Sequence, residues 1–129
     1  MNPIALDCVA VLGVLLFAQG PIISVLRGRS GHFHGYQNDP SDPLYKWVRA
    51  HGNTAEYAAF LAVLLLWLGA HNPPDWVVWS MALVTLCRVL FVAGMVIPKT
   101  MATPNPLRFV GALGTYVFGL ALVAGLFAV

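Results

Sequence analysis

Residues 49–57 (RAHGNTAEY) carry side chains that could bind a charged ligand. Arg49, Asn53 and Glu56 are spaced i, i+4 and i+7, so on a helix they project from one face over roughly 10 Å of its length. The stretch lies just inside an apolar segment, where charged groups are costly and normally face a bundle interior or a wet cavity. We therefore expect a polar stripe that faces away from lipid.

Further cations accompany this stripe. Arg88 stands deep in another apolar segment, and Arg108 opens a fourth one on the same side of the membrane. One interpretation is structural: Arg49 or Arg88 pairs with Glu56 between helices, and Arg108 is an interfacial anchor. The other is an anionic ligand, because one glutamate cannot satisfy all of these cations.

The charge pattern narrows the class of ligand. Arginine binds carboxylates bidentately, while Glu56 is suited to receive an ammonium group and Asn53 to bind amide groups. A molecule with more than one carboxylate and a single ammonium group fits this set. Glutathione has that pattern, and an arginine near its sulfur would favour the nucleophilic thiolate.

The elements that position these residues are four apolar segments, at about residues 4–26, 44–70, 76–97 and 107–128. Each is long enough to cross a bilayer as a helix, which takes about 20 residues. The chain is only 9% charged, whereas a soluble domain is about a quarter charged. We therefore expect an all-α integral membrane protein with one domain over residues 1–129. Short connections favour antiparallel neighbours, and hence an up-down four-helix bundle.

The basic residues are unevenly distributed among the connections at 27–43, 71–75 and 98–106. The first and third connections share one side of the membrane, and near them lie Arg27, Arg29, Lys46, Arg49, Lys99 and Arg108. The opposite side has Asp7 and Asp75 and no Lys or Arg. The positive-inside rule predicts that loops one and three are cytoplasmic and that both termini lie on the opposite side.

Other features indicate no site. The net charge of +2 gives no reason to expect nucleic acid. Cys8 and Cys87 lie far apart within apolar segments, so we expect two buried free thiols. His32 and His34 have no third ligand nearby, so we predict an ordinary loop and no metal site. The glycines of the fourth segment are typical of close helix packing.

The pattern Arg49-Ala50-His51-x-Asn53-x-x-Glu56 resembles the helix-two signature of the MAPEG family, the membrane-associated proteins of eicosanoid and glutathione metabolism. The resemblance covers the whole chain, with its long first loop, tight second loop and basic third loop. Arg88 matches the family's arginine in the middle of helix three. The segment Asn105-Pro106-Leu107-Arg108 resembles the Pro-x-Arg segment that opens helix four.

The resemblance implies a homotrimer in the lipid bilayer that binds glutathione as a co-substrate between neighbouring subunits, near the cytoplasmic side. A lipophilic small molecule would enter from the bilayer along a groove between subunits. Arg108 would be the catalytic residue that stabilises the thiolate. The implied glutathione-binding residues are Arg49, Asn53, Glu56 and Arg88, with His51 and Tyr57 close by and Arg27 or Arg29 at the end of helix one.

Two positions depart from the family pattern. Counting from Arg88 without gaps, the family's helix-three tyrosine falls on Met95, and the aromatic residue one turn earlier falls on Phe91. The interpretation we favour is a glutathione-dependent transferase or peroxidase that acts on lipophilic electrophiles. The alternatives are a non-catalytic protein of the same fold that binds a lipid or another anionic ligand, and a structural membrane protein whose buried charges join helices.

Overall fold

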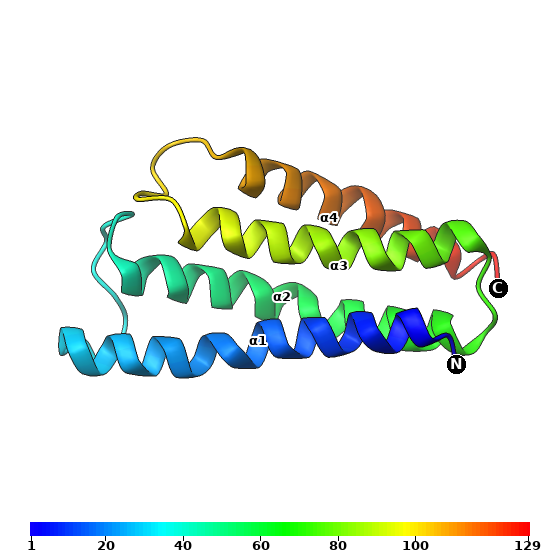
Figure 1. Ribbon diagram of the computed structural model, residues 1–129, viewed down its shortest axis with the longest axis horizontal. Coiled ribbons are helices and arrows are strands. Elements are labelled where there is room, and N and C mark those ends of the chain that lie inside the picture. The colour runs from blue at the N-terminus through cyan, green and yellow to red at the C-terminus, as the bar shows by residue number, and fades with distance from the viewer.

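The computed structural model describes residues 1–129 as four helices: α1 (Pro3–Ser30), α2 (Pro43–Ala70), α3 (Asp75–Val96) and α4 (Pro106–Gly125). The helices lie side by side and alternate in direction, so the first and third connections meet at one end and both termini lie at the other (Figure 1). All four are long and apolar enough to cross a membrane. This confirms the predicted all-α four-helix bundle of a multi-pass membrane protein.

Three of the helices begin at the same local motif, an Asn or Asp followed by a proline. The side chains of Asn2, Asp42 and Asn105 each accept a hydrogen bond from a backbone N–H in the first turn. The proline in each motif loses nothing by lacking an N–H, because the first N–H groups of a helix have no partner within it. These caps fix where α1, α2 and α4 start.

The predicted ends of two helices need correction. The first apolar segment was expected to end near Leu26, but α1 continues to Ser30 and ends at Gly31, whose φ of 73° suits glycine. Arg27 and Arg29 therefore belong to the last turn of α1 and not to the loop. At the other end of the chain, α4 ends at Gly125, three residues before the predicted boundary.

Glycines bring α3 and α4 into close contact. A Cβ atom at Gly111 would lie 2.5 Å from Phe91 N and 2.7 Å from Cys87 O, and one at Gly94 would collide with the backbone of Arg108. Gly114 likewise faces Cys87. The predicted role of the helix-four glycines in packing is confirmed at positions 111, 114 and 125, the last of which faces Val77, whereas Gly119 faces open space.

The hydrophobic core lies toward the end of the bundle that holds the termini. It is formed by side chains of all four helices, namely Ala5, Cys8, Leu12, Leu61, Leu64, Leu65, Leu68, Val77, Met81, Val84 and Leu122. Cys8 and Cys87 are both buried and free, as predicted. A smaller cluster of Ala50, Val92 and Met95 lies toward the opposite end.

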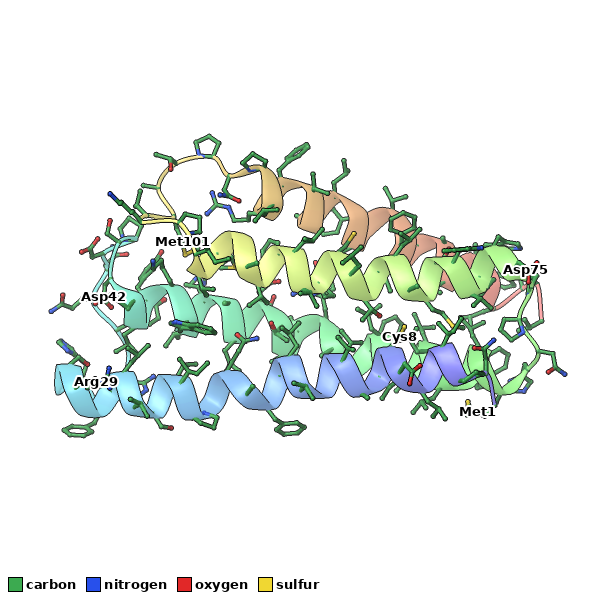
Figure 2. The ribbon with its side chains drawn as sticks, viewed as in Figure 1. Met1, Cys8, Arg29, Asp42, Asp75 and Met101 are labelled. Carbon is green, nitrogen blue, oxygen red and sulfur yellow. The ribbon has the colours of Figure 1, made fainter.

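Polar contacts join the two connections at that opposite end. The backbone N–H of Met101 donates to Pro40 O (2.9 Å), and Lys46 Nζ donates to Pro98 O (2.8 Å) and Val96 O (3.3 Å). Figure 2 shows Arg29, Asp42 and Met101 at this end and Met1 and Asp75 at the other. The basic end of the bundle is therefore also the end at which loops one and three are fastened together.

Candidate functional site

The predicted polar stripe of α2 lines a groove. Arg49, Asn53 and Glu56 share it with Gly52 and with Tyr36 from the first loop, and its volume is about 230 Å³. A Cβ atom at Gly52 would meet no atom within 4 Å, so the missing side chain leaves room in front of the helix. We call this space the polar groove. Its three charged and amide side chains come together as their spacing predicts.

Arg88 of α3 contacts the polar groove from the buried side of the bundle, through the groove residue Asn53. Its Nη2 donates to Asn53 Oδ1 at 2.6 Å and to Asn53 O at 3.4 Å. Because Oδ1 accepts from Arg88, the amide nitrogen of Asn53 is left to donate elsewhere. The groove is thus equipped with donors at Arg49 and Asn53 and with one acidic acceptor at Glu56.

The Arg88 side chain is only 2% exposed. Its guanidinium carbon lies 4.8 Å from the centre of the Tyr57 ring and 5.0 Å from that of Phe91, so two aromatic rings and one amide surround the cation. Glu56 is exposed in the groove and is not a hydrogen-bond partner of Arg88. The predicted direct pair between Glu56 and Arg88 is therefore absent within one chain, and Glu56 acts on Arg88 only at longer range. A buried cation without a carboxylate makes its surroundings favourable for an anion.

A second groove shares one lining residue with the polar groove. It runs between α2 and α4, has a volume of about 470 Å³ and shares Glu56 with the polar groove. One end carries Glu56, Tyr57, Thr115 and Tyr116, and the rest is lined by Phe60, Leu61, Leu64, Gly119, Leu120 and Val123. We call it the apolar groove. Glu56 therefore stands at the junction of a charged space and a space suited to a hydrocarbon chain.

Tyr116 is the lining residue that sequence reasoning missed. It stands in α4 two turns beyond Arg108, and no motif in the sequence distinguishes it from the other aromatic residues of that helix. Its position beside Tyr57 depends on how far α4 is shifted along α2, which the packing of α4 on α3 determines. Only the three-dimensional structure brings the two phenols to one groove.

Arg108 lies apart from the polar groove within one chain. Its Nη1 donates to Met101 O and its Nη2 to Thr103 O, both at 3.0 Å, so it holds the third loop against the start of α4. It lines a separate groove of about 860 Å³ with Phe91 and Phe109. The structure does not bring Arg108 together with the α2 stripe in a single subunit.

The remaining predicted residues have other surroundings. Arg27 Nη1 donates to His32 O (3.2 Å) and Gly35 O (2.9 Å), which fixes the start of the loop that carries Tyr36. His51 is half-buried and lines neither groove. Met95 is buried in the small core cluster, so the residue in place of the family's tyrosine does not line the polar groove.

Comparison with known proteins gives one match. The model of the MAPEG family matches residues 5–128, which is nearly the whole chain. Neither the curated proteins nor the solved structures contain a match to the chain.

Proposed function

The chain belongs to the MAPEG family, and on that premise we propose that it is a glutathione-dependent transferase or peroxidase that acts on lipophilic electrophiles within the membrane. The family includes such enzymes as well as non-catalytic members. The observation that carries the proposal is the junction at Glu56. Glu56 lines both a groove with donors at Arg49 and Asn53 and a groove suited to a hydrocarbon chain.

The polar groove matches glutathione group by group. Arg49 binds a carboxylate through its planar guanidinium, and Glu56 receives the ammonium group. The free amide N–H of Asn53, which Arg88 orients, donates to a peptide carbonyl or to the second carboxylate. The buried charge of Arg88 adds to the attraction for the tripeptide, whose two carboxylates outnumber its one ammonium.

Activation of the thiol requires a cation near the sulfur, and Arg108 is the residue to which we assign this role. Because Arg108 and the α2 stripe line different grooves of one subunit, the assignment needs a neighbouring subunit to complete the site. We therefore propose a homotrimer in which glutathione binds between subunits. Only a trimeric mass in mild detergent agrees with this arrangement, and a monomeric mass would contradict it.

The thiolate then reacts with a substrate held in the apolar groove. In the transferase reaction, the sulfur forms a bond to an electrophilic carbon, and the electron pair released moves to the leaving group or to an oxygen of the substrate. Reactants bound in two grooves that share Glu56 would lie close together, which would lower the entropic cost of the reaction.

A non-catalytic binding protein is the second candidate. The observation that favours it is the engagement of Arg108 with the carbonyls of Met101 and Thr103, because a guanidinium held by the third loop has fewer N–H groups for a thiolate. Such a protein would bind glutathione or another anionic ligand in the polar groove without activating it.

One titration separates the two candidates. Purified trimer is titrated with glutathione while the ultraviolet absorbance of the thiolate is followed, for the wild type and for Arg108→Ala. A thiolate signal that disappears in the variant supports the enzyme. Binding without a thiolate signal supports the non-catalytic protein, and the absence of any binding would contradict both.

We also propose that the end with the first and third loops is cytoplasmic, since the Lys and Arg residues near the helix ends belong to that end. Cys8 and Cys87 are buried, so introduced cysteines report on sidedness cleanly. A membrane-impermeant maleimide should label Asn72→Cys in intact cells and Gln37→Cys only after lysis. The reverse pattern would show the opposite orientation.

A further inference from the structure

We propose that Lys46 is a positioning residue for Arg108: it anchors the third loop, and the loop in turn fixes the direction of the Arg108 guanidinium. This inference rests on the proposed glutathione-dependent function and adds how its thiolate-stabilising cation is held in place. It starts from a lysine that stands at an electrostatically unfavourable position in its own helix.

Lys46 is the fourth residue of α2 and therefore belongs to the first turn of that helix. A cation is unfavourable there, because the amino end of a helix carries the positive pole of its macrodipole. The side chain is also buried, and its ammonium group donates to two carbonyls and to no carboxylate. The favourable part of its surroundings must come from these two contacts.

Both contacts lie at the carboxyl end of α3. Lys46 Nζ donates to Pro98 O at 2.8 Å and to Val96 O at 3.3 Å. The last carbonyls of a helix have no partner within it, and a cation at this end complements the macrodipole. Lys46 thus ties the start of α2 to the end of α3 and to the first residues of the third loop.

The third loop continues from this anchor to Arg108. Met101 is bound on both sides: its N–H donates to Pro40 O at 2.9 Å, and its carbonyl oxygen accepts from Arg108 Nη1 at 3.0 Å. Thr103 O accepts from Arg108 Nη2, also at 3.0 Å. Figure 2 shows Met101 at the same end of the bundle as Asp42, which begins α2.

These contacts orient the guanidinium without using it up. A guanidinium has five N–H donors in a fixed plane, so two bonds to the loop leave the other three for the groove that Arg108 lines. Donors that are already in place stabilise a charge most effectively as it forms, here when the thiol proton leaves to water. Lys46 lines none of the three grooves described above, so it acts only through the loop.

The test follows the thiolate absorbance of glutathione, bound at saturation to the purified protein, as a function of pH. Lys46→Met releases the start of the loop, so Arg108 spreads over several side-chain conformations. We expect the thiolate titration midpoint to rise by about one pH unit, which means about tenfold less thiolate below the midpoint. Lys46→Arg keeps a cation with N–H donors and should restore most of the shift. Glutathione affinity should stay within about threefold of the wild type in both variants.

Lys99→Met is the matched control, because it removes a lysine charge from the same loop. Lys99 is exposed and does not take part in the contacts that anchor the loop, so its variant should keep the wild-type midpoint. Loop order is measured separately by trypsin, which cleaves after Lys99. Cleavage there should be several times faster in Lys46→Met than in Lys46→Arg. If Lys46→Met does not fold, Lys46→Gln, whose side chain is shorter and uncharged, takes its place under the same criteria.

A raised midpoint in Lys46→Met that Lys46→Arg restores and Lys99→Met lacks supports the positioning role. An unchanged midpoint in Lys46→Met, or an equal rise in Lys99→Met, overturns this role while leaving the proposed function intact. A wild-type protein that binds no glutathione, or binds it without a thiolate signal, overturns the proposed enzyme and the positioning role together.

Discussion

Arg88 of α3 and Asn53 of α2 are joined by a hydrogen bond of 2.6 Å between Nη2 and Oδ1, and this buried arginine forms no salt bridge. The contact has two consequences. It turns the amide nitrogen of Asn53 toward other partners, and it holds a buried positive charge that has no salt-bridge partner next to the polar groove. Both consequences favour an anionic ligand, and both can be tested by substitution.

Removing the cation should destabilise the bundle. Arg88→Met removes the charge-assisted hydrogen bond to the half-buried Asn53 Oδ1, and the loss of such a bond costs about 1.5–3 kcal/mol of unfolding free energy. Arg88→Lys keeps the charge but has no planar fork, so an intermediate stability is expected. Thermal unfolding in detergent measures both variants, and a Met variant as stable as the wild type would show that the contact contributes nothing.

Replacing the amide by a carboxylate should separate stability from binding. Asn53→Asp gives Arg88 an ionised partner, and charge-assisted bonds are about twice as strong as neutral ones. The variant should therefore unfold at or above the wild-type temperature. It should nevertheless lose most glutathione affinity, because the donor is gone and a negative charge faces the ligand.

The exposed loop residue Asn38 provides the control for this experiment. Asn38→Asp makes the same chemical change outside the groove, so both affinity and stability should remain those of the wild type. If Asn53→Asp bound glutathione as well as Asn38→Asp, the amide of Asn53 would have no role in binding.

The close approach of α3 and α4 predicts opposite outcomes for two glycines of one helix. Gly111→Ala forces a methyl group against Phe91 N and Cys87 O, and overpacking of this kind costs about 1–3 kcal/mol. Gly119→Ala meets nothing within 4 Å and gains helix propensity, so it should be neutral or slightly stabilising. Thermal unfolding midpoints of the two variants, measured in parallel, test this prediction. Equal midpoints would contradict the close packing of α3 against α4 at Gly111.

Arg27 should control the order of the first loop. Its side chain holds the carbonyls of His32 and Gly35, whereas Arg29 is exposed and makes no such contact. Chymotrypsin cleaves after aromatic residues, and Phe33 and Tyr36 lie in this loop. We expect Arg27→Ala to be cleaved there several times faster than Arg29→Ala, which should match the wild type. Identical cleavage of the two variants would show that the contacts of Arg27 do not order the loop.

Much of the fold was predictable because its determinants are local. Twenty or so apolar residues in a row specify a membrane helix, and the Asn2-Pro3, Asp42-Pro43 and Asn105-Pro106 motifs mark three helix starts. The shared face of Arg49, Asn53 and Glu56 follows from helical periodicity alone. The end of α1 was harder to place, because polar residues at 27–30 continue the helix as readily as they begin a loop.

The non-local parts of the site were not predictable. Arg88 contacts Asn53 and not Glu56, which lies about one helical turn further along α2. Which of the two it meets depends on how α3 is positioned against α2, and the hydropathy pattern does not encode this position. Arg108 and Tyr116 depend on the shift of α4 along its neighbours, which the glycine contacts with α3 determine. The sequence therefore predicted a binding stripe but not which cations and hydroxyls accompany it.

The most direct test of the central claim asks whether Glu56 recognises the ammonium group of glutathione. The dissociation constants of glutathione and of its deaminated analogue, which lacks that group, are measured by calorimetry for the wild type and for Glu56→Gln. The wild type should bind glutathione several times more tightly than the analogue, since an ion pair with an exposed carboxylate contributes up to about 1 kcal/mol. This preference should vanish in Glu56→Gln. Equal affinity of the wild type for both molecules, or no binding of either, would contradict the assignment of the polar groove to glutathione.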